Sequence, residues 1–555
     1  MPPRLDPDRV RDAASRFPPD ADGDPPPYGT AGFRAQAPIL PPVLLRCGLL
    51  AAIKSLAAGK MCGVMVTASH NPEEDNGAKL IGPVGEMMSP EWEDYANRLV
   101  AAGSDDQLAA EAAAIWRQEG IDSIDEGRGG PVGGVVVGCD NRPSAGLLVE
   151  AALAGVACTG VPVVRAGLQT TPQLHFRVRA RNLGQPWGEA DYYDRLAMGL
   201  AKASRDLVGD AVPGRWAAVG TDGLLLDCAN GVGAAKAEAL IARLREAGCG
   251  WRFDVRNVGP RGLNDRVGAD HVEKQRALPL GFETVAKGAR CCSIDGDADR
   301  LVYFAPDGKR GLTLFDGNKI AALLALYIKD ALKGMPGIAE TFKVGVVQTA
   351  YANGASTNYL KTELGLQPVM TSTGVKHLHR EAASFDVGVY FEANGHGTVL
   401  FSNDLIAKLR KIEYEDEAAR DLLAMAEVMN QAVGDALSGM LMVECILRRK
   451  VWGLKEWEDM YTDLPSRQLK VMVADRAVIK TTDAETRCIA PDSLQQGIDA
   501  AVARRKSGRA FARPSGTENV VRIYAEAASQ GEADSLAKDV ARLVHKLAGG
   551  IGPVP

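Results

Sequence analysis

The sequence predicts an α/β fold divided among several domains, and a repeated local pattern carries this prediction. In that pattern an apolar run ends in small or polar residues and a helix-compatible stretch follows, which indicates a buried strand, a loop and a helix. The pattern occurs three times, at 135–145, 224–235 and 344–356, and helical patterns cover 236–247 and 319–331. Repetition of such a unit is typical of α/β domains with parallel or mixed sheets, so we expect three of them.

The C-terminal part of the chain has a different pattern. Short strand-like runs at 468–473 and 520–525 precede an amphipathic helix that reaches 536–547. This predicts a smaller α+β domain after the three α/β domains. The predicted domains are 1–206, 207–306, 307–452 and 453–555.

Length and composition limit the class of protein. A chain of 555 residues is too long for one core, because cores stop growing at roughly 250 to 300 residues. The hydrophobic fraction of 46% and the charged fraction of 24% are those of a soluble globular protein. A net charge of -6 provides no basic face for nucleic acid and argues weakly against anionic membranes, so we expect small-molecule partners.

The cellular compartment is predicted from the termini and the cysteines. The N-terminus is charged and Pro-rich, unlike a signal peptide, and no apolar run approaches the length of a membrane span. The 10 cysteines are scattered and contain no C-x-x-C pair, which fits reduced thiols. We therefore expect a cytoplasmic protein without a membrane partner.

The segment T-A-S-H-N-P at 67–72 is the first candidate site. It follows a strand-like run, and Pro72 with the small residues before it predicts an exposed loop that presents a hydroxyl group. Ser69 is therefore the candidate nucleophile. Taken alone, the segment is interpreted equally well as an ordinary polar turn.

The segment D-G-D-A-D-R at 295–300 is the second candidate site, and it lies between two apolar runs. Its alternate carboxylates, from Asp295, Asp297 and Asp299, can converge on one point. Three hard oxygen ligands in one loop suit Mg²⁺, which prefers octahedral oxygen coordination and shares its sites with phosphate oxygens. We expect one magnesium ion per chain.

An EF-hand calcium loop is excluded at this segment. Its sixth and twelfth positions would have to be Gly and Glu, whereas the sequence has Arg300 and Pro306 there. A guanidinium such as that of Arg300 orients carboxylates and phosphates through paired hydrogen bonds, so we expect Arg300 to orient the metal-binding carboxylates. A solvated acidic turn is the remaining alternative.

The segment R-P-S-G-T at 513–517 combines a fixed cation, two hydroxyl groups and a flexible glycine. Such donors converge on an anion, so the segment predicts a phosphate cradle. The predicted phosphate-binding residues are Arg513, Ser515, Gly516 and Thr517, with Arg522 as a further donor.

Two further segments, G-V-K-H at 374–377 and E-A-N-G-H-G at 392–397, offer groups suited to sugar hydroxyls. Each is a weak signal alone, since a lone histidine is more often structural than functional. The Glu, Asn and His of the second segment would project from one side if the chain is extended there. The predicted sugar-binding residues are Gly374, Val375, Lys376, His377, Glu392, Asn394 and His396.

Taken in order, these segments resemble the α-D-phosphohexomutase superfamily, whose members carry a phosphoserine loop, a metal loop, a sugar loop and a phosphate loop on four successive domains around a central cleft. The resemblance covers essentially the whole chain and includes Y-G-T-A-G-F-R at 28–34. The two sugar segments and the stretch 461–476 look like those of eukaryotic-type phosphoacetylglucosamine mutases.

The resemblance implies a phosphomutase for amino sugars. The implied reaction is the reversible interconversion of N-acetylglucosamine 6-phosphate and N-acetylglucosamine 1-phosphate, for UDP-N-acetylglucosamine biosynthesis. Ser69 would carry the phosphoryl group and complete the Mg²⁺ site, and hexose 1,6-bisphosphate would serve as activator and intermediate. The other implied catalytic residues are Arg34, His70, Lys79 and His396, among which the general base stays open. We expect a monomer or weak dimer.

Three alternatives accompany this hypothesis. A phosphoglucomutase or phosphomannomutase would differ only in what the two sugar segments admit. A catalytically silent binding paralogue would usually have lost the nucleophile or the metal ligands, and here both are present. A simple metal-dependent phosphatase would release inorganic phosphate steadily without needing a bisphosphate primer.

Overall fold

The structure is a computed structural model and describes residues 5–19, 25–29, 32–121, 133–204, 223–309, 311–335, 337, 340–482, 484–516 and 518–554. The chain divides into two compact units. The first unit comprises Met1–Leu314 and Ala424–Val451, and the second comprises Phe315–Leu423 and Trp452–Pro555.

The first unit contains two mixed sheets of five strands each. In the first sheet the order is β1-β3-β2-β4-β5, where β2, β4 and β5 are parallel and β3 is antiparallel to both of its neighbours. Its strands are β1 (Phe33–Gln36), β2 (Met61–Val66), β3 (Asp75–Ile81), β4 (Gly134–Cys139) and β5 (Val163–Leu168).

In the second sheet the order is β10-β9-β8-β6-β7, where β6 is parallel to β7 and β8 and β9 is antiparallel to β8. In each sheet the carboxyl ends of the parallel strands lie at one edge, and polar side chains meet there: Thr67 with Asp140 in the first sheet, and Ser293 with Asp227 in the second. The strands are β6 (Gly223–Asp227), β7 (Arg252–Arg256), β8 (Cys291–Ile294), β9 (Leu301–Pro306) and β10 (Leu312–Phe315).

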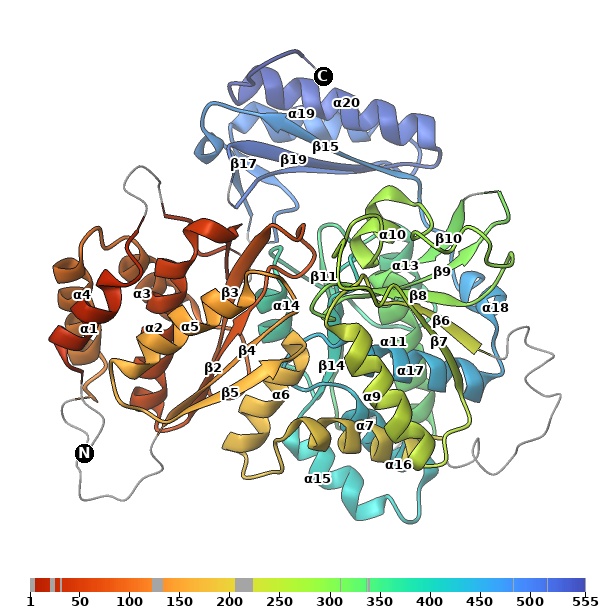
Figure 1. The fold of residues 1–555 in the computed structure, drawn as a ribbon. Coiled ribbons are helices and arrows are strands. Elements are labelled where there is room, and N and C mark those ends of the chain that lie inside the picture. Colours follow the sequence, from red (N-terminus) through yellow and green to blue (C-terminus); the bar gives the residue numbers. More distant parts are fainter. Residues whose placement is uncertain are drawn as a thin grey trace. The chain divides into compact units, whose positions relative to one another are not determined.

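Helices pack on both faces of the first sheet (Figure 1). Helices α2 and α5 cover one face and α6 covers the other. Helices α2 and α5 approach closely because glycines face the partner backbone: a Cβ atom at Gly48 would lie 1.9 Å from the carbonyl oxygen of Ala152. The described helices of this unit are η1 (Ala37–Ile39), α1 (Pro7–Ser15), α2 (Pro41–Ala58), α3 (Pro90–Val100), α4 (Asp105–Gln118), α5 (Ala145–Ala157), α6 (Thr171–Asn182), α7 (Glu189–Ala203), α9 (Gly233–Glu246), α10 (Ala269–Gln275) and α17 (Ala436–Lys450).

Helix α2 corrects one expectation. By length and composition it is apolar enough to cross a membrane, so the expectation that no apolar run approaches that length is wrong. Of its apolar window, 72% is buried inside the structure. Contacts with α5 and the first sheet account for this burial, as for a core helix of an α/β layer.

The second unit contains a mixed four-stranded sheet, an antiparallel three-stranded sheet and a two-stranded ribbon. Their orders are β12-β11-β13-β14, β15-β19-β18 and β16-β17. The strands are β11 (Val344–Thr349), β12 (Val369–Thr371), β13 (Val387–Phe391), β14 (Gly397–Phe401), β15 (Ser466–Met472), β16 (Lys480–Thr481), β17 (Cys488–Ala490), β18 (Arg509–Pro514) and β19 (Val520–Glu526).

The C-terminal sheet is covered on one face by α19 and α20 (Figure 1), which gives this part of the chain the predicted α+β arrangement. Helix α16 (Glu417–Val428) leads from the second unit into the first. The other described helices of the second unit are α11 (Gly317–Lys333), α13 (Gly354–Thr362), α14 (Val375–Ala382), α15 (Asn403–Ile412), α18 (Leu454–Glu458), η4 (Arg476–Val478), α19 (Asp492–Val502) and α20 (Gln530–Leu547).

The predicted fold class is confirmed. Each of the three segments with the repeated pattern forms a strand, a loop and a helix: β4 with α5, β6 with α9 and β11 with α13. The three predicted domain boundaries stay predictions, and the one at 206/207 lies outside the described residues. All 10 cysteines are free.

Candidate active site

Ser69 lies in the loop after β2 and contacts the acidic segment directly. Its Oγ atom donates a hydrogen bond of 2.8 Å to Oδ2 of Asp295. Its backbone has a φ of 55°, which residues other than glycine rarely adopt. The residue is only 1% exposed, so the expectation of an exposed hydroxyl group is wrong, whereas Pro72 at the end of the same segment is exposed.

A buried arginine that the sequence analysis missed holds this loop. Arg142 follows β4, and Asp140 accepts a hydrogen bond of 3.0 Å from its Nε atom. Asp140 also accepts one of 2.7 Å from the hydroxyl of Thr67, which in turn accepts one from the backbone N–H of Ser69. The guanidinium of Arg142 donates to the backbone carbonyls of Ser69, Asn71, Pro72 and Asp75.

Asn264, which lies between β7 and α10, binds the same loop. Its Nδ2 atom donates to the carbonyls of Ser69 at 2.9 Å and Asn71 at 3.0 Å. Arg142 and Asn264 together satisfy carbonyls that a tight loop would otherwise bury unpaired. The strained conformation of Ser69 is therefore held by side chains from two other segments.

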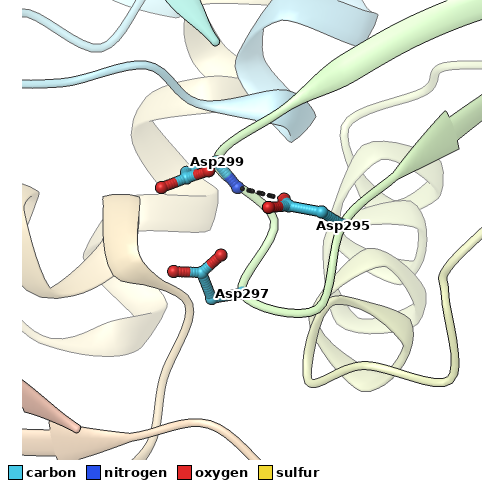
Figure 2. A group of neighbouring side chains, drawn as sticks. All are labelled: Asp295, Asp297 and Asp299. Carbon is cyan, nitrogen blue, oxygen red and sulfur yellow. Dashed lines mark hydrogen bonds between the residues drawn. The ribbon is translucent and has the colours of Figure 1, made fainter. Parts of the chain in front are cut away.

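Asp295, Asp297 and Asp299 converge as expected. One oxygen from each carboxylate lies within 4.8 Å of the others, and all three residues are buried. Figure 2 shows the three side chains turned toward one another from the short loop between β8 and β9. Burial, followed by the charges of its two neighbours, raises the pKa of Asp295 well above its usual range.

These carboxylates fit a hard divalent cation. Hard oxygen ligands at this spacing suit Mg²⁺. One oxygen of Asp297, Oδ1, is buried and has no hydrogen-bond partner among the described residues. Such an orphaned carboxylate oxygen is costly in a dry site unless a cation binds there.

Lys79, on β3, lies against this acidic group. Its Nζ atom is 2.7 Å from Oδ2 of Asp297 and 2.6 Å from Oδ2 of Asp299. Burial lowers the pKa of Lys79, but the two carboxylates outweigh burial and raise the pKa overall. Thr171 also donates to Asp297, at 2.6 Å, and is a further residue that the sequence analysis missed.

Arg300 and His70 both lie close to another carboxylate, that of Asp270, which the sequence analysis also missed. Arg300 donates to Asp270 at 2.5 Å, and its backbone N–H donates to Asp295 at 3.0 Å. Nε2 of His70 is 3.8 Å from Asp270. Burial, followed by the charge of Arg300, lowers the pKa of His70 well below its usual range.

Arg34 completes the predicted residues of the first unit. It lies on β1 opposite Gly77 of β3. Burial, followed by the charge of Arg300, lowers its pKa, while the three aspartates act in the opposite direction. The preceding residues Thr30 and Ala31 lie outside the described residues.

In the second unit, the phosphate segment lies at the end of β18. Arg513 is buried and lies directly opposite Arg522 of β19, whose side chain is exposed. Nη1 of Arg513 is 2.7 Å from Glu485, and Glu485 also accepts a hydrogen bond of 2.9 Å from the backbone N–H of Thr373. Ser515 is buried and Gly516 follows it, whereas Thr517 lies outside the described residues.

The first sugar segment forms the start of helix α14. Gly374 has a φ of 132° and caps α14, which Val375 begins. Lys376 and His377 therefore lie in the first turn of that helix, directly after the Thr373 N–H that binds Glu485. Glycine allows the chain to enter the helix at this angle.

The second sugar segment is a tight turn between β13 and β14, so the extended chain that would project its Glu, Asn and His from one side is not present. Glu392 donates its N–H to the carbonyl of His396 at 2.9 Å, and Asn394 accepts the N–H of His396 at 3.0 Å. Gly395 supplies the positive φ of 87° that such a turn requires. Glu392 and Asn394 are themselves joined, since Nδ2 of Asn394 donates to Glu392 at 3.3 Å.

Three family models match the chain. A model described as phosphoacetylglucosamine mutase AMG1, domain III, matches residues 316–452. The phosphoglucomutase/phosphomannomutase C-terminal domain matches 467–543, and its alpha/beta/alpha domain I matches 49–107 and 105–186.

Curated relatives match over nearly their whole length. Phosphoacetylglucosamine mutase of Sus scrofa is 46% identical over 537 residues, covering 95% of both chains. The enzyme of the same name from Arabidopsis thaliana is 45% identical, covering 94% of this chain and 95% of its own. That of Homo sapiens is 44% identical, covering 95% of both.

Solved structures show the same similarity. Aspergillus fumigatus N-acetylphosphoglucosamine mutase in complex with GlcNAc-6P and magnesium is 41% identical with a TM-score of 0.88, covering 98% of this chain and 99% of its own. An N-acetylglucosamine-phosphate mutase of the α-D-phosphohexomutase superfamily, in its product complex, is 35% identical with a TM-score of 0.89, covering 97% and 100%.

Proposed function

The chain belongs to the phosphoacetylglucosamine mutase family of the α-D-phosphohexomutase superfamily, and on that premise we propose that it interconverts N-acetylglucosamine 6-phosphate and N-acetylglucosamine 1-phosphate through phosphorylated Ser69. One observation carries this proposal above all: the Ser69 hydroxyl contacts Asp295 of the convergent acidic group. A nucleophile in that position has its phosphorylated form beside a cation site.

The proposed reaction has two phosphoryl transfers. In the first, the bond between phosphorus and Ser69 Oγ breaks, a bond to the free hydroxyl oxygen of the sugar forms, and the hydroxyl proton is passed to Ser69. This gives a 1,6-bisphosphate. In the second, Ser69 takes the other phosphoryl group and its proton goes to the sugar oxygen, so the serine is phosphorylated again and nothing is consumed.

Asp295, Asp297, Asp299 and a phosphoserine oxygen are the proposed ligands of Mg²⁺, which when bound neutralises charge on the transferred group. A phosphoserine carries about -1.5 to -2 charges at neutral pH, so further cations are needed around it. Lys79 provides one, since it already lies against Asp297 and Asp299. Arg300 is held by Asp270 at the edge of the same group, and it provides the second.

The proton-transfer residue is proposed among Arg34, His70, Lys79 and His396. His70 is held near Asp270, and its lowered pKa keeps the imidazole neutral, the form that accepts a proton. Burial, followed by the positive charge of Arg300, is the physical cause of that state, and it outweighs the opposite effect of Asp270.

The substrate's second phosphate is proposed to bind in the second unit. Arg513, Ser515, Gly516, Thr517 and Arg522 are the proposed phosphate residues, and the turn 392–397 with the start of α14 at 374–377 is proposed to contact the sugar. Since either the 1-phosphate or the 6-phosphate must occupy this place in turn, the cradle has to accept the sugar in two orientations. A cradle built from guanidinium, hydroxyl and backbone donors does this, because it binds the phosphate and not the ring.

The test is an isomerisation assay with purified protein, Mg²⁺ and a trace of hexose 1,6-bisphosphate. The 6-phosphates of N-acetylglucosamine, glucose and mannose are offered separately and 1-phosphate formation is followed by ³¹P NMR. We expect preference for the N-acetylated sugar, and loss of turnover with EDTA or Ser69→Ala. Preference for glucose or mannose would overturn the sugar assignment, steady release of inorganic phosphate would favour a phosphatase, and no isomerisation would favour a silent paralogue.

The partners and the compartment complete the proposal. A small phosphosugar is the proposed partner, with no role for nucleic acid or a membrane, and the chain is proposed to act as a monomer or weak dimer in the cytoplasm. The net charge of -6 supports the absence of a nucleic-acid footprint.

A further inference from the structure

Three consecutive carbonyl groups of the acidic loop each bind the start of a different helix. The carbonyl of Gly296 accepts a hydrogen bond from Val232 at the start of α9, that of Asp297 from Thr171 at the start of α6, and that of Ala298 from Ala436 at the start of α17. All three distances are 3.1 Å. The first N–H groups of a helix have no partner inside the helix, so each of these bonds satisfies a donor and an acceptor at once.

The consequence for the carboxylates is geometric. With its carbonyls bound outward by three helices, the loop turns its alternate side chains inward to one point, as Figure 2 shows. Ala298, between Asp297 and Asp299, has a φ of 58°, a conformation that costs free energy for a residue with a Cβ atom. The hydrogen bond from Ala436 therefore acts on the most strained residue of the loop.

Asp435 determines where the N–H of Ala436 lies. It caps α17, accepting the N–H groups of Leu437 at 3.1 Å and Ser438 at 3.2 Å. The hydroxyl of Tyr192, on α7, donates to both of its carboxylate oxygens at 2.9 and 3.0 Å. Asn430 donates to it at 3.1 Å, and the residue is 3% exposed.

The segment that carries Asp435 is remote in sequence from the loop that it holds. It belongs to Ala424–Val451, a segment of the first unit. In the chain this segment follows β11 to β14, the four strands of the second unit's mixed sheet. Asp435 and Tyr192 are not part of the group of carboxylates that converges on the candidate cation site, which consists of Asp295, Asp297 and Asp299. Their effect on the ion passes through the backbone of Ala436 and Ala298.

We propose that Asp435 is a positioning residue for the metal loop: with Tyr192 it fixes the start of α17, whose first N–H holds Ala298 between the metal-binding aspartates. This proposal rests on the cation site of the proposed function and extends it to residues outside the site. Loss of the Asp435 contacts lets Ala298 relax, so the carboxylates separate and divalent-cation affinity falls, while the chemistry at saturating metal is retained.

The experiment uses the full chain and Mn²⁺ as the probe, with free Mn²⁺ measured by electron paramagnetic resonance during titration. We expect Tyr192→Phe and Asp435→Ala to weaken Mn²⁺ binding by about 3- to 10-fold, the effect of losing one or two hydrogen bonds. Asp435→Asn, which keeps a capping oxygen, should recover part of the affinity. The matched control is Tyr303→Phe, which removes a hydroxyl that binds α17 further along, at Met440 and Glu444.

The outcomes separate the two proposals. Wild-type protein that does not bind Mn²⁺ would overturn the cation site of the proposed function itself. Wild-type binding with unchanged affinity in Tyr192→Phe, or an equal loss in Tyr303→Phe, would overturn only the role of Asp435. If Asp435→Ala does not fold, the Mn²⁺ affinity of Tyr192→Phe alone tests the role of Asp435. As a second measurement, kcat at saturating Mg²⁺ should stay near the wild-type value while the Mg²⁺ concentration for half-maximal activity rises.

Discussion

The guanidinium of Arg513 lies 2.7 Å from the carboxylate of Glu485. The cation that we propose for the substrate's phosphate is therefore already paired with an anion of the same chain. A phosphate must compete with that carboxylate, because both seek the same donors. Glu485 is also bound by the N–H of Thr373, so releasing it would free the residue that precedes the first sugar segment.

Replacing Glu485 by Gln should therefore tighten phosphate binding. The side chain keeps its shape and loses its charge, so it competes with the phosphate by about 1 kcal/mol less, and we expect the Ki of inorganic phosphate and the KM of the sugar phosphate to fall by about 3- to 10-fold. Glu246→Gln is the matched control, since Glu246 lies 2.6 Å from the exposed Arg243, which is not among the proposed phosphate residues. A rise in KM in Glu485→Gln would mean that Glu485 orients Arg513 for the phosphate instead of competing with it.

Arg142→Lys should lower kcat far more than it changes KM. A lysine cannot reach several carbonyls of the Ser69 loop with a planar fork, so the nucleophile moves. A displacement of about 1 Å can cost on the order of 10²-fold in rate. Steady-state kinetics measure this, and Arg243→Lys, in an exposed ion pair with Asp194, is the control.

Chemical rescue adds a readout for Arg142 that general destabilisation would not give. Guanidinium ion added to Arg142→Ala should restore part of kcat, because it can occupy the vacated carbonyl sites. Absence of rescue, together with a lowered melting temperature and unchanged kcat per folded molecule, would reduce Arg142 to a structural residue.

Lys79→Met should destabilise the metal-free protein and make Mg²⁺ more stabilising. The substitution leaves the carboxylates of Asp297 and Asp299 buried without their cation, a change that typically costs about 3 to 5 kcal/mol. A divalent cation offsets that penalty, so the rise in melting temperature on adding Mg²⁺ should be larger in the variant than in the wild type. Thermal unfolding with Mg²⁺ and with EDTA measures both, and equal increments would contradict the prediction.

Two buried thiols and one that is partly buried should resist alkylation until high pH. Burial raises the pKa of Cys139, Cys158 and Cys488 to about 11, because the thiolate is the charged form and loses its hydration. Only the thiolate reacts, so at pH 8 about one thiol in a thousand is reactive, and the rate should rise about tenfold per pH unit below pH 11. Peptide mass spectrometry after iodoacetamide treatment measures this, with unfolded protein as the control.

The sequence predicted those features that side-chain pattern alone determines. Apolar runs indicated β4, β6 and β11, and alternate aspartates in a short loop indicated a convergent acidic group. The same reasoning failed for 392–397, because side-chain alternation matters only in an extended chain. There, Gly395 and the hydrogen bond from His396 to Asn394 close a turn. Asn followed by Gly is a turn signal that was available in the sequence.

Other residues could not be predicted, since their partners are backbone atoms from distant segments. Arg142 and Asn264 bind carbonyls of the Ser69 loop, and because every residue has a backbone carbonyl, the sequence does not indicate which one will be bound. Asp435 is further removed, because it acts through the N–H of Ala436. The strained φ of Ser69 belongs to the same class: a local rule is broken there because contacts from elsewhere hold it.

The hydrogen bond from Ala436 to Ala298 also affects when the acidic loop can reach its final structure during synthesis. During synthesis the acidic loop leaves the ribosome well before α17 is translated. The carbonyl of Ala298 therefore has no α17 partner until the chain has passed the proposed sugar-binding segments. A nascent chain that has just completed β9 therefore has the aspartates but not their final geometry. For the same reason, a fragment of residues 1–314 prepared alone would contain every proposed metal ligand and still lack one of the three helices that hold them.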